Sequence, residues 1–451
     1  MKTDIHWKTI GLTSHHGIAL PLSALHTKNS HGIGEFLDLI PLIDFCKEIG
    51  FDTIQLLPIN ESGYDQSPYT ILSSTALNPI YISISELGIF DPELKKLTLT
   101  KRVEYAKVRQ RKLALLKDYY DKNKTHENFE AFLQALCFSQ MEYVRAYAEK
   151  NHCFLKGDIP ILLSSNSEDI KKYPSLFNDE LVAGAPPDMY NKNGQKWGFP
   201  IMNWEKMREK HFAWWIHRLT IASHLYHIYR IDHVVGLFRI WAIPKDKEAK
   251  DGFFIPEDTN LWEKQGREIL EMMLHASQIL PIAEDLGIVP PEVRKILKEY
   301  GICGTKVMRW ERKYSHHPIE YIPFEEYEPY SLTTVSTHDS ETLQQWWKNN
   351  PAEAKPFAEL KQWTYQPDLT IEQRFDLLHD AHHTPSYFHI NLLQEYLAIF
   401  PELVSENPDD ERINIPGEVL PTNWSYRFRP SIEQMQKHPQ LISSMQKIKG
   451  Q

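Results

Sequence analysis

Four charged residues in the second half of the chain have the types and positions needed for bond-breaking chemistry. Arg230 and Asp232 stand two positions apart in the apolar stretch 228–236, and Glu284 and Asp339 each follow another apolar, strand-like run. On a strand, Arg230 and Asp232 project to the same side. A charge is kept in an enclosed place only when it is paired or has a chemical task. Paired carboxyl groups suit glycosidic-bond cleavage, in which one acid protonates the leaving oxygen and another carboxylate attacks or activates water.

The charges also predict how that work would be divided. A cation beside a carboxylate favours its ionised form, so Arg230 would keep Asp232 charged, as a nucleophile requires. Glu284 would instead have to be protonated when substrate arrives. The structural alternatives stay open: Arg230 and Asp232 can form a simple ion pair, Asp232 or Asp339 can cap a helix, and Glu284 can pair with a neighbouring cation.

A metal site is the other explanation of a carboxylate cluster. The strand-end set contains no histidine at ligand spacing, and the histidines at 379, 382 and 383 lie in a separate segment that is expected to be helical. We therefore predict neither a metal nor a cofactor.

The elements that must position these residues alternate regularly between strand and helix. Eight apolar runs have strand character, and each is followed by a helical pattern. They cover residues 17–24, 51–57, 153–162, 228–236, 278–283, 302–310, 331–336 and 412–415. This order predicts an α/β fold, a (β/α)8 TIM barrel with helical and loop insertions around its active-site rim. In such a barrel the residues after the strands gather on one rim, so the three carboxylates are expected to converge.

Two insertions are expected in a single catalytic barrel that spans residues 1–451. From about 88 to 152 the chain has long charged helical patterns without a strand signal. From about 164 to 204 it is dense in Gly, Pro, Asn and Asp. Loops of that length in a compact protein are usually functional, which favours an active-site lid.

Composition limits the partners and the location. Lys and Arg total 50 against 60 for Asp and Glu, and no dense basic run occurs, so neither nucleic acid nor a membrane surface is an expected partner. The four cysteines are far apart and form no CxxC pair, which favours a reducing cytoplasm. We find neither a signal-peptide pattern nor a membrane-length apolar run, so a cytoplasmic protein is expected. The sequence predicts no oligomeric state.

Nine short segments, in order along the chain, carry a family resemblance. The sequence resembles the amylomaltases, the 4-alpha-glucanotransferases of glycoside hydrolase family 77 in the α-amylase clan. The matching segments are Gly32–Glu35, Ser67–Tyr69, Gly157–Ile161, Gly184–Asp188, Gly194–Gly198, Arg230–His233, Ala283–Gly287, Thr337–Asp339 and Arg412–Gly417.

The resemblance implies a role for each matching residue. It makes Asp232 the nucleophile that forms a covalent glucosyl-enzyme, Glu284 the general acid and base, and Asp339 the carboxylate that holds the distorted sugar. It makes Arg230 and His338 contacts of the donor sugar. Further substrate contacts are implied at Tyr69, which would stack on a sugar, at the lid residues Asp188, Gln195 and Trp197, and at Ser67 and Asn414.

The implied activity is transfer of α-1,4-linked glucosyl or glucan segments between maltodextrins, maltose or glycogen and glucose or glucan acceptors. Two rivals remain. An α-glucosidase or amylase would use the same carboxylates on water, and a catalytically idle glucan-binding protein would use none of them. For Tyr69 and Trp197, ordinary core packing is the alternative.

Overall fold

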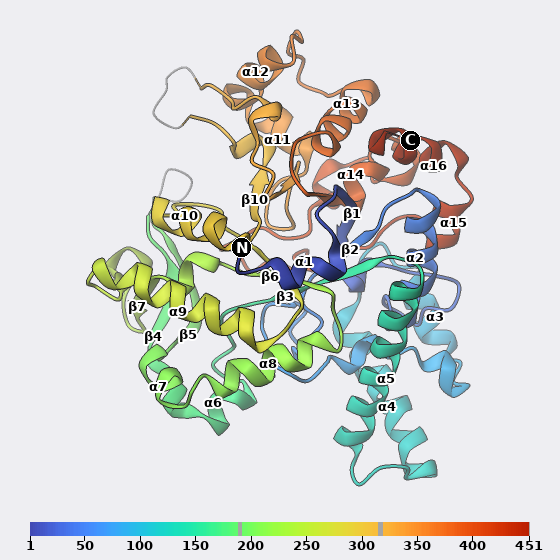
Figure 1. The fold of residues 1–451 in the computed structure, drawn as a ribbon. Coiled ribbons are helices and arrows are strands. Elements are labelled where there is room, and N and C mark those ends of the chain that lie inside the picture. The colour runs from blue at the N-terminus through green and yellow to red at the C-terminus, as the bar shows by residue number, and fades with distance from the viewer. Residues whose placement is uncertain (188–191, 314–318, 451) are drawn as a thin grey trace.

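Eight parallel strands form a barrel at the centre of the molecule (Figure 1). The computed structural model describes residues 1–187, 192–313 and 319–450. The barrel strands are β1 (His15–Leu20), β2 (Thr53–Leu56), β3 (Phe154–Ile159), β6 (Ile228–Ile231), β9 (Leu280–Ala283), β10 (Gly304–Val307), β11 (Ser331–Thr334) and β12 (Phe388–Leu392). Most strand positions are buried, because helices cover the outside and side chains fill the inside. The (β/α)8 barrel predicted from the sequence is confirmed.

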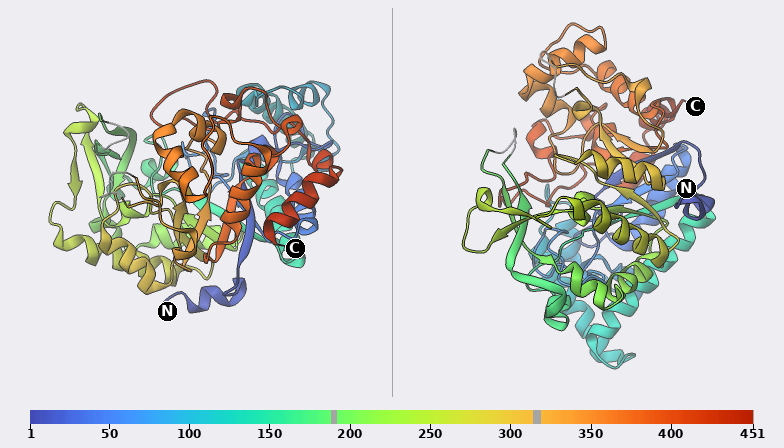
Figure 2. Two further views of the ribbon diagram at one scale, coloured as in Figure 1. Left: turned by 90° about the horizontal axis from the view of Figure 1, so that it is seen from above. Right: turned by 60° about the vertical axis from the view of Figure 1, so that its left-hand side comes forward.

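Helices surround the barrel and form two lobes on opposite sides of it (Figures 1 and 2). One lobe contains α11 (Leu343–Asn349), α12 (Pro351–Leu360) and α13 (Ile371–His382), and the other contains α4 (Tyr105–Asn123) and α5 (Phe129–Lys150). The other α-helices are α1 (Asp4–Ile10), α2 (Leu39–Glu48), α3 (Pro92–Thr98), α6 (Glu168–Lys172), α7 (Trp204–Glu209), α8 (Ala213–Ser223), α9 (Asn260–Ala276), α10 (Pro291–Tyr300), α14 (Leu393–Leu397), α15 (Ile432–Gln436) and α16 (Pro439–Lys449). Among the described residues, no helix is both long and apolar enough to cross a membrane.

The junction between β9 and β10 closes the barrel with little backbone pairing. One bridge, Ile282 with Cys303, joins the two strands. Side chains supply the remaining links: the Thr305 backbone N–H donates to Asp285 Oδ1 at 2.7 Å, and Thr305 Oγ1 donates to the Ala283 carbonyl at 2.9 Å. A Cβ at position 304 would lie 2.7 Å from Asp285 Oδ1, so a larger residue there would displace the carboxylate that accepts from Thr305.

The eighth barrel strand is not where the sequence pattern predicts it. The predicted strand at 412–415 is a loop on the rim, and β12 takes its place. Strand β12 contains two polar residues, His389 and Asn391, which interrupt the apolar pattern expected of a buried strand. Both are nevertheless buried. Asn391 is satisfied there because its Oδ1 accepts from the Val335 N–H at 2.8 Å and its Nδ2 donates to Tyr396 Oη at 3.0 Å. Buried polar groups need such partners, and a linear pattern does not reveal them.

The range predicted as a lid loop contains a second sheet. Strands β4 (Phe177–Ala185) and β5 (Gln195–Met202) pair antiparallel, and β7 (Ile240–Pro244) and β8 (Phe253–Ile255) extend them in the order β5-β4-β7-β8. This sheet lies beside the barrel, at the left of Figure 1. The sequence analysis predicted a loop here and missed these strands, because register shifts between β4 and β5 break the alternation by which strands are recognised.

Three helices lie between β2 and β3: α3 (Pro92–Thr98), α4 (Tyr105–Asn123) and α5 (Phe129–Lys150). A buried ion pair fastens them to the barrel. Lys112 Nζ lies 2.6 Å from Glu35 Oε1, and the two side chains are 0% and 1% exposed. Lys112 also donates to the carbonyls of Ile80 and Ile82. Removing one partner of such a pair leaves an uncompensated buried charge and costs about 3–5 kcal/mol.

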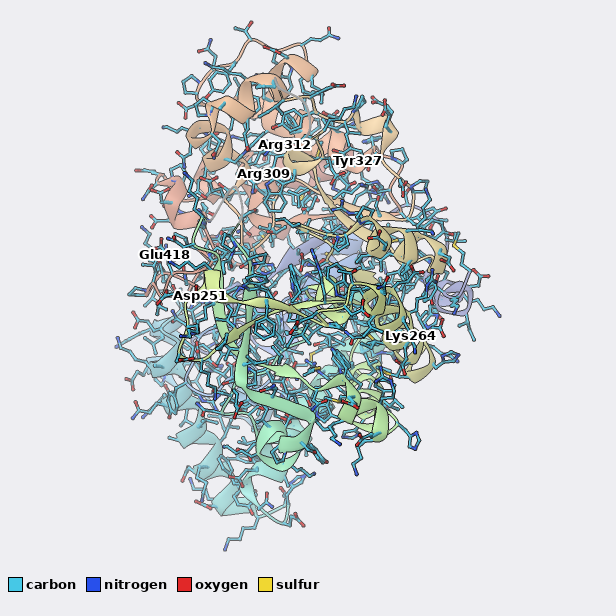
Figure 3. All side chains as sticks on the ribbon, turned by 90° about the vertical axis from the view of Figure 1, so that its left-hand side faces the viewer. Asp251, Lys264, Arg309, Arg312, Tyr327 and Glu418 are labelled. Atoms are coloured by element: carbon cyan, nitrogen blue, oxygen red, sulfur yellow. The ribbon has the colours of Figure 1, made fainter. Side chains whose placement is uncertain are left out.

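Two arginines from the segment after β10, Arg309 and Arg312, connect the parts of the lobe around α11 and α12. Both are labelled in the upper part of Figure 3, near Tyr327. Arg309 is buried and donates to the Glu341 carbonyl at 2.7 Å. Arg312 pairs with Glu353 at the start of α12, with an N–O distance of 2.8 Å. These contacts hold the lobe against the rim that follows β10 and β11.

Three histidines, His16, His382 and His389, are buried where α13 covers β1 and β12. The His16 and His382 rings stack with centroids 5.0 Å apart and Nδ1 atoms 2.8 Å apart, and His389 stacks on His16 at 4.9 Å. Burial lowers the pKa of His16 to about 3 and of His389 to about 4, and it holds the pKa of His382 well below its ordinary value. The three rings are therefore neutral at neutral pH.

This histidine cluster predicts a loss of stability in mild acid. The unfolded chain takes up protons near pH 6.5, whereas the folded cluster resists them until about pH 3–4, so the free energy of unfolding decreases as pH falls below 6.5. Each pKa unit corresponds to about 1.4 kcal/mol. Urea titrations between pH 7 and pH 4 should give a shallower dependence for His389→Gln than for the parent. His126→Gln, a substitution of an exposed histidine, serves as control. Equal slopes for all three proteins would contradict the prediction.

Candidate active site

Charged residues from several barrel strands meet at the carboxyl-terminal rim of the barrel. Asp158 lies in β3 and Arg230 in β6, while Asp232 and Glu284 directly follow β6 and β9. Asp339 follows β11. This is the rim on which such barrels carry their chemistry.

Arg230 joins three carboxylates. Its Nη1 donates to Asp158 at 2.8–2.9 Å and to Asp232 Oδ1 at 2.7 Å, and its Nη2 lies 3.6 Å from Glu284 Oε2. The predicted common face of Arg230 and Asp232 is confirmed, and the ion pair is present as well. Charge on these carboxylates outweighs the burial of Arg230 and raises its pKa well above the ordinary value, so the guanidinium stays charged.

Asp158 is a member of this network that the sequence analysis did not assign. Its side chain is 0% exposed and also accepts from Tyr69 Oη at 2.8 Å. Asp158 is in register with Arg230 across the β3–β6 ladder. The available signal was a charged residue inside an apolar strand, but its partner belongs to a strand about 70 residues away.

Glu284 has a different environment from Asp232. The backbone N–H groups of His233 and Leu286 donate to its carboxyl group at 2.8 and 3.1 Å. Burial nevertheless raises the pKa of Glu284 to about 8, and Asp232 adds to the rise while Arg230 opposes it. Glu284 therefore holds a proton at neutral pH. Two neighbouring carboxyl groups whose environments differ in this way can serve as acid and nucleophile.

Asp339 is held by His338 and by the rim loop that replaced the predicted eighth strand. Asn414 Nδ2 donates to Asp339 Oδ1 at 2.7 Å, and His338 Nε2 lies 3.3 Å from Oδ2. Burial favours the neutral acid, but the charge and hydrogen bond of His338, together with the bond from Asn414, lower the pKa of Asp339 to about 2. Its side chain is 45% exposed, so an ionised carboxylate faces the open side of the rim.

Tyr69 lies between the two halves of this network. Its ring stacks on His338, with centroids 5.3 Å apart and planes 14° apart, and its Oη lies 2.9 Å from His338 Nε2. Trp424, another residue that the sequence analysis did not assign, lies 5.4 Å from the Tyr69 ring. Ser67 accepts from the Tyr69 N–H at 3.3 Å, and within the described chain its hydrogen bonds stay in its own loop.

Two of the three predicted lid residues lie on β5. The Trp197 ring stands at 87° to the His233 ring, with centroids 4.9 Å apart, and Trp197 Nε1 donates to Gln195 Oε1 at 3.1 Å. The small sheet thus reaches the residue that follows Asp232. Asp188, the third predicted lid residue, lies outside the described residues.

Within residues 1–187, 192–313 and 319–450, no group of three or more His, Cys, Asp or Glu side chains is arranged to hold a metal ion.

Known proteins resemble this chain along nearly its whole length. A family model described as glycoside hydrolase family 77, 4-alpha-glucanotransferase, matches residues 20–132 and 123–433. A 4-alpha-glucanotransferase of Chlamydia pneumoniae is 42% identical, over 98% of this chain and 96% of that protein.

Two solved structures share the fold. An amylomaltase from Streptococcus agalactiae in complex with acarbose superposes with a TM-score of 0.78 at 22% identity, covering 97% of this chain and 99% of that one. An amylomaltase from Corynebacterium glutamicum gives a TM-score of 0.81 at 21% identity, covering 99% and 76%. The match to the family model and the relative at 42% identity agree with the barrel fold. The chain therefore belongs to glycoside hydrolase family 77, the 4-alpha-glucanotransferases.

Proposed function

We propose that the protein is a retaining 4-alpha-glucanotransferase that moves α-1,4-linked glucosyl or glucan segments from maltodextrins, maltose or glycogen to glucose or glucan acceptors. The observation that carries the proposal is the contrast between Glu284, which burial keeps protonated, and Asp232, which Arg230 contacts at 2.7 Å. Family membership and this contrast support the same reaction. No cofactor takes part.

The first half of the reaction cleaves the donor. The Asp232 carboxylate attacks C1 of the glucosyl unit, and Glu284 passes its proton to the departing 4-oxygen. The C1–O4 bond breaks, a glycosyl ester to Asp232 forms, and Glu284 becomes a carboxylate. The N–H groups of His233 and Leu286 stabilise that carboxylate in the intermediate.

The second half rebuilds the bond. The 4-hydroxyl of an acceptor gives its proton to Glu284 and attacks C1, which releases Asp232. Two inversions at C1 retain the α configuration. Asp339, ionised at every working pH, holds hydroxyl groups of the distorted sugar, and Tyr69 and His338 bind the donor beside it.

Transfer wins over hydrolysis only when water is kept from the glycosyl ester. We infer that the segment of about 164–204 covers the site, since Trp197 on β5 contacts His233 beside Asp232. The segment of about 88–152 acts as a helical subdomain of the one catalytic barrel. Asp188, Gln195, Ser67 and Asn414 complete the substrate contacts. A cytoplasmic location fits four cysteines that are all free and buried.

Incubation with maltotriose tests the function. Transfer gives glucose together with a ladder of longer maltooligosaccharides, which chromatography of the products resolves. Glucose and maltose without longer products would identify a hydrolase, and unchanged maltotriose would identify an idle binding protein. Repeating the incubation with maltose as sole donor determines whether the shortest donor is accepted.

A further inference from the structure

The turn directly after β6 has a strained backbone that faces Glu284. His233 has φ 45° and ψ 55°, in the left-handed region, which few residues other than glycine adopt; asparagine, aspartate and histidine are the most frequent of them. This conformation aims two consecutive N–H groups at residue 284: that of His233 at Oε2, 2.8 Å away, and that of Val234 at the backbone carbonyl, 3.1 Å away. Strain of this kind persists where the surroundings enforce it, and functional sites are the usual place.

The side chain of the same residue faces the small sheet. Trp197 on β5 meets the His233 ring at 4.9 Å and 87°, an edge-to-face contact. The ring also packs tightly against Gly236, since a Cβ there would lie 3.0 Å from His233 Cδ2. Within the described part of the chain no side chain or backbone group hydrogen-bonds the ring nitrogens, so packing fixes the ring.

We propose that His233 is a positioning residue that links the β4–β5 hairpin to Glu284. Trp197 holds the His233 ring, the held ring keeps the turn left-handed, and the turn keeps its N–H on the Glu284 carboxyl group. The inference rests on the proposed function, because it assumes that Glu284 is the general acid and base. It adds that the Glu284 carboxyl group keeps its position only while Trp197 of the β4–β5 hairpin contacts His233.

The charged groups around Glu284 determine in which direction its pKa changes when the His233 N–H is lost. Arg230 on β6 and Asp232 directly after it act on Glu284, the charge of Arg239 acts on the His233 ring, and on β10 Lys306 is paired with Glu311 at 2.9 Å. The N–H of His233 donates to the ionised form of Glu284 and so lowers its pKa. Losing that N–H moves the alkaline limb of the pH profile to higher pH and slows the step that needs the carboxylate.

Two substitutions separate the backbone from the ring. His233→Val keeps the N–H but resists the left-handed region; we expect kcat to fall by about 100-fold and the alkaline limb to rise by about half a pH unit or more. His233→Asn accepts the left-handed region and loses the ring contact; we expect a fall in kcat of about tenfold with the limb nearly unmoved. Phe212→Val, at another left-handed aromatic residue, between α7 and α8, is the control and should alter thermal stability without moving the limb.

A double-mutant cycle tests the link even if His233→Val does not fold. Trp197→Leu should cost at least about threefold less kcat in the His233→Asn background than in the parent, because the two residues act through one contact. Independent effects that simply multiply, or an unmoved limb in a folded His233→Val, would overturn the proposal. A parent that forms no ladder from maltotriose would instead overturn the proposed function, so the two failures are distinguishable.

Discussion

Replacing Asp232 with Asn lowers the rate of maltotriose disproportionation by roughly 10⁴-fold or more, as expected when a nucleophile is removed from a group of residues that acts as a unit. The amide has the size and shape of the carboxylate but cannot form the glycosyl ester. Arg230 keeps both of its contacts to Asp158, so the rest of the rim stays in place. Maltotriose binding, measured by calorimetry, should stay within about threefold of the parent, because binding uses groups that the substitution leaves intact.

The control for this substitution is Asp246→Asn, which removes a carboxylate that is 79% exposed beside Lys247. Its disproportionation rate should equal that of the parent. Parental activity in Asp232→Asn would refute the assignment of the nucleophile. Loss of both turnover and binding would show that the variant damages the rim. Asp232→Ala would then be tested, after its thermal unfolding transition has been shown to match that of the parent.

The pH dependence of transfer should have an alkaline limb near pH 8. The pKa of Glu284 is raised to about 8, and the proton must be present when the donor is cleaved, so kcat/KM falls tenfold per pH unit above that value. Asp339, whose pKa is lowered to about 2, is ionised throughout and contributes no limb in the working range. Initial rates of maltotriose disproportionation from pH 5 to pH 10 measure the limb.

The variant Glu284→Gln tests whether Glu284 is the group whose titration produces the alkaline limb. With maltotriose the rate should fall by about 10³-fold, the usual contribution of a positioned acid and base. With 4-nitrophenyl α-maltoside the first release of nitrophenolate should fall by no more than about tenfold, because a weakly basic leaving group needs no proton. This release should show no alkaline limb near pH 8. A limb that survives in the variant would mean that another group titrates there.

The local sequence pattern predicted the parts of the site that share a strand. Arg230 and Asp232 stand on one face because side chains alternate along β6, and the alternation of strand and helix places Glu284 on the same rim. Asp158 was not assigned to the site, and the contact of Tyr69 with it was not predicted, because both depend on residues that are distant in the sequence. Their contacts join β3, β6 and the loop after β2, and nothing in the spacing of those residues along the chain records the meeting.

The fold was mispredicted where polar residues are buried or strands are irregular. β12 carries His389 and Asn391 under a covering of helices, so its pattern resembles an exposed segment. The loop at 412–415 has the buried Ile413 and resembles a strand, yet it delivers Asn414 to Asp339 from the rim. In both places tertiary contacts decide the structure, and local propensity carries little information about them.

The number of backbone pairs differs between neighbouring barrel strands, and this difference indicates where the barrel opens most easily. The first and last barrel strands, β1 and β12, share the ladder with the most paired residues in the barrel. The junction in mid-chain, between β9 and β10, depends on one bridge and on the side chains of Thr305 and Asp285. Regions with few backbone bonds open at the lowest free energy. We therefore expect local opening of the barrel to begin at this junction, next to Glu284.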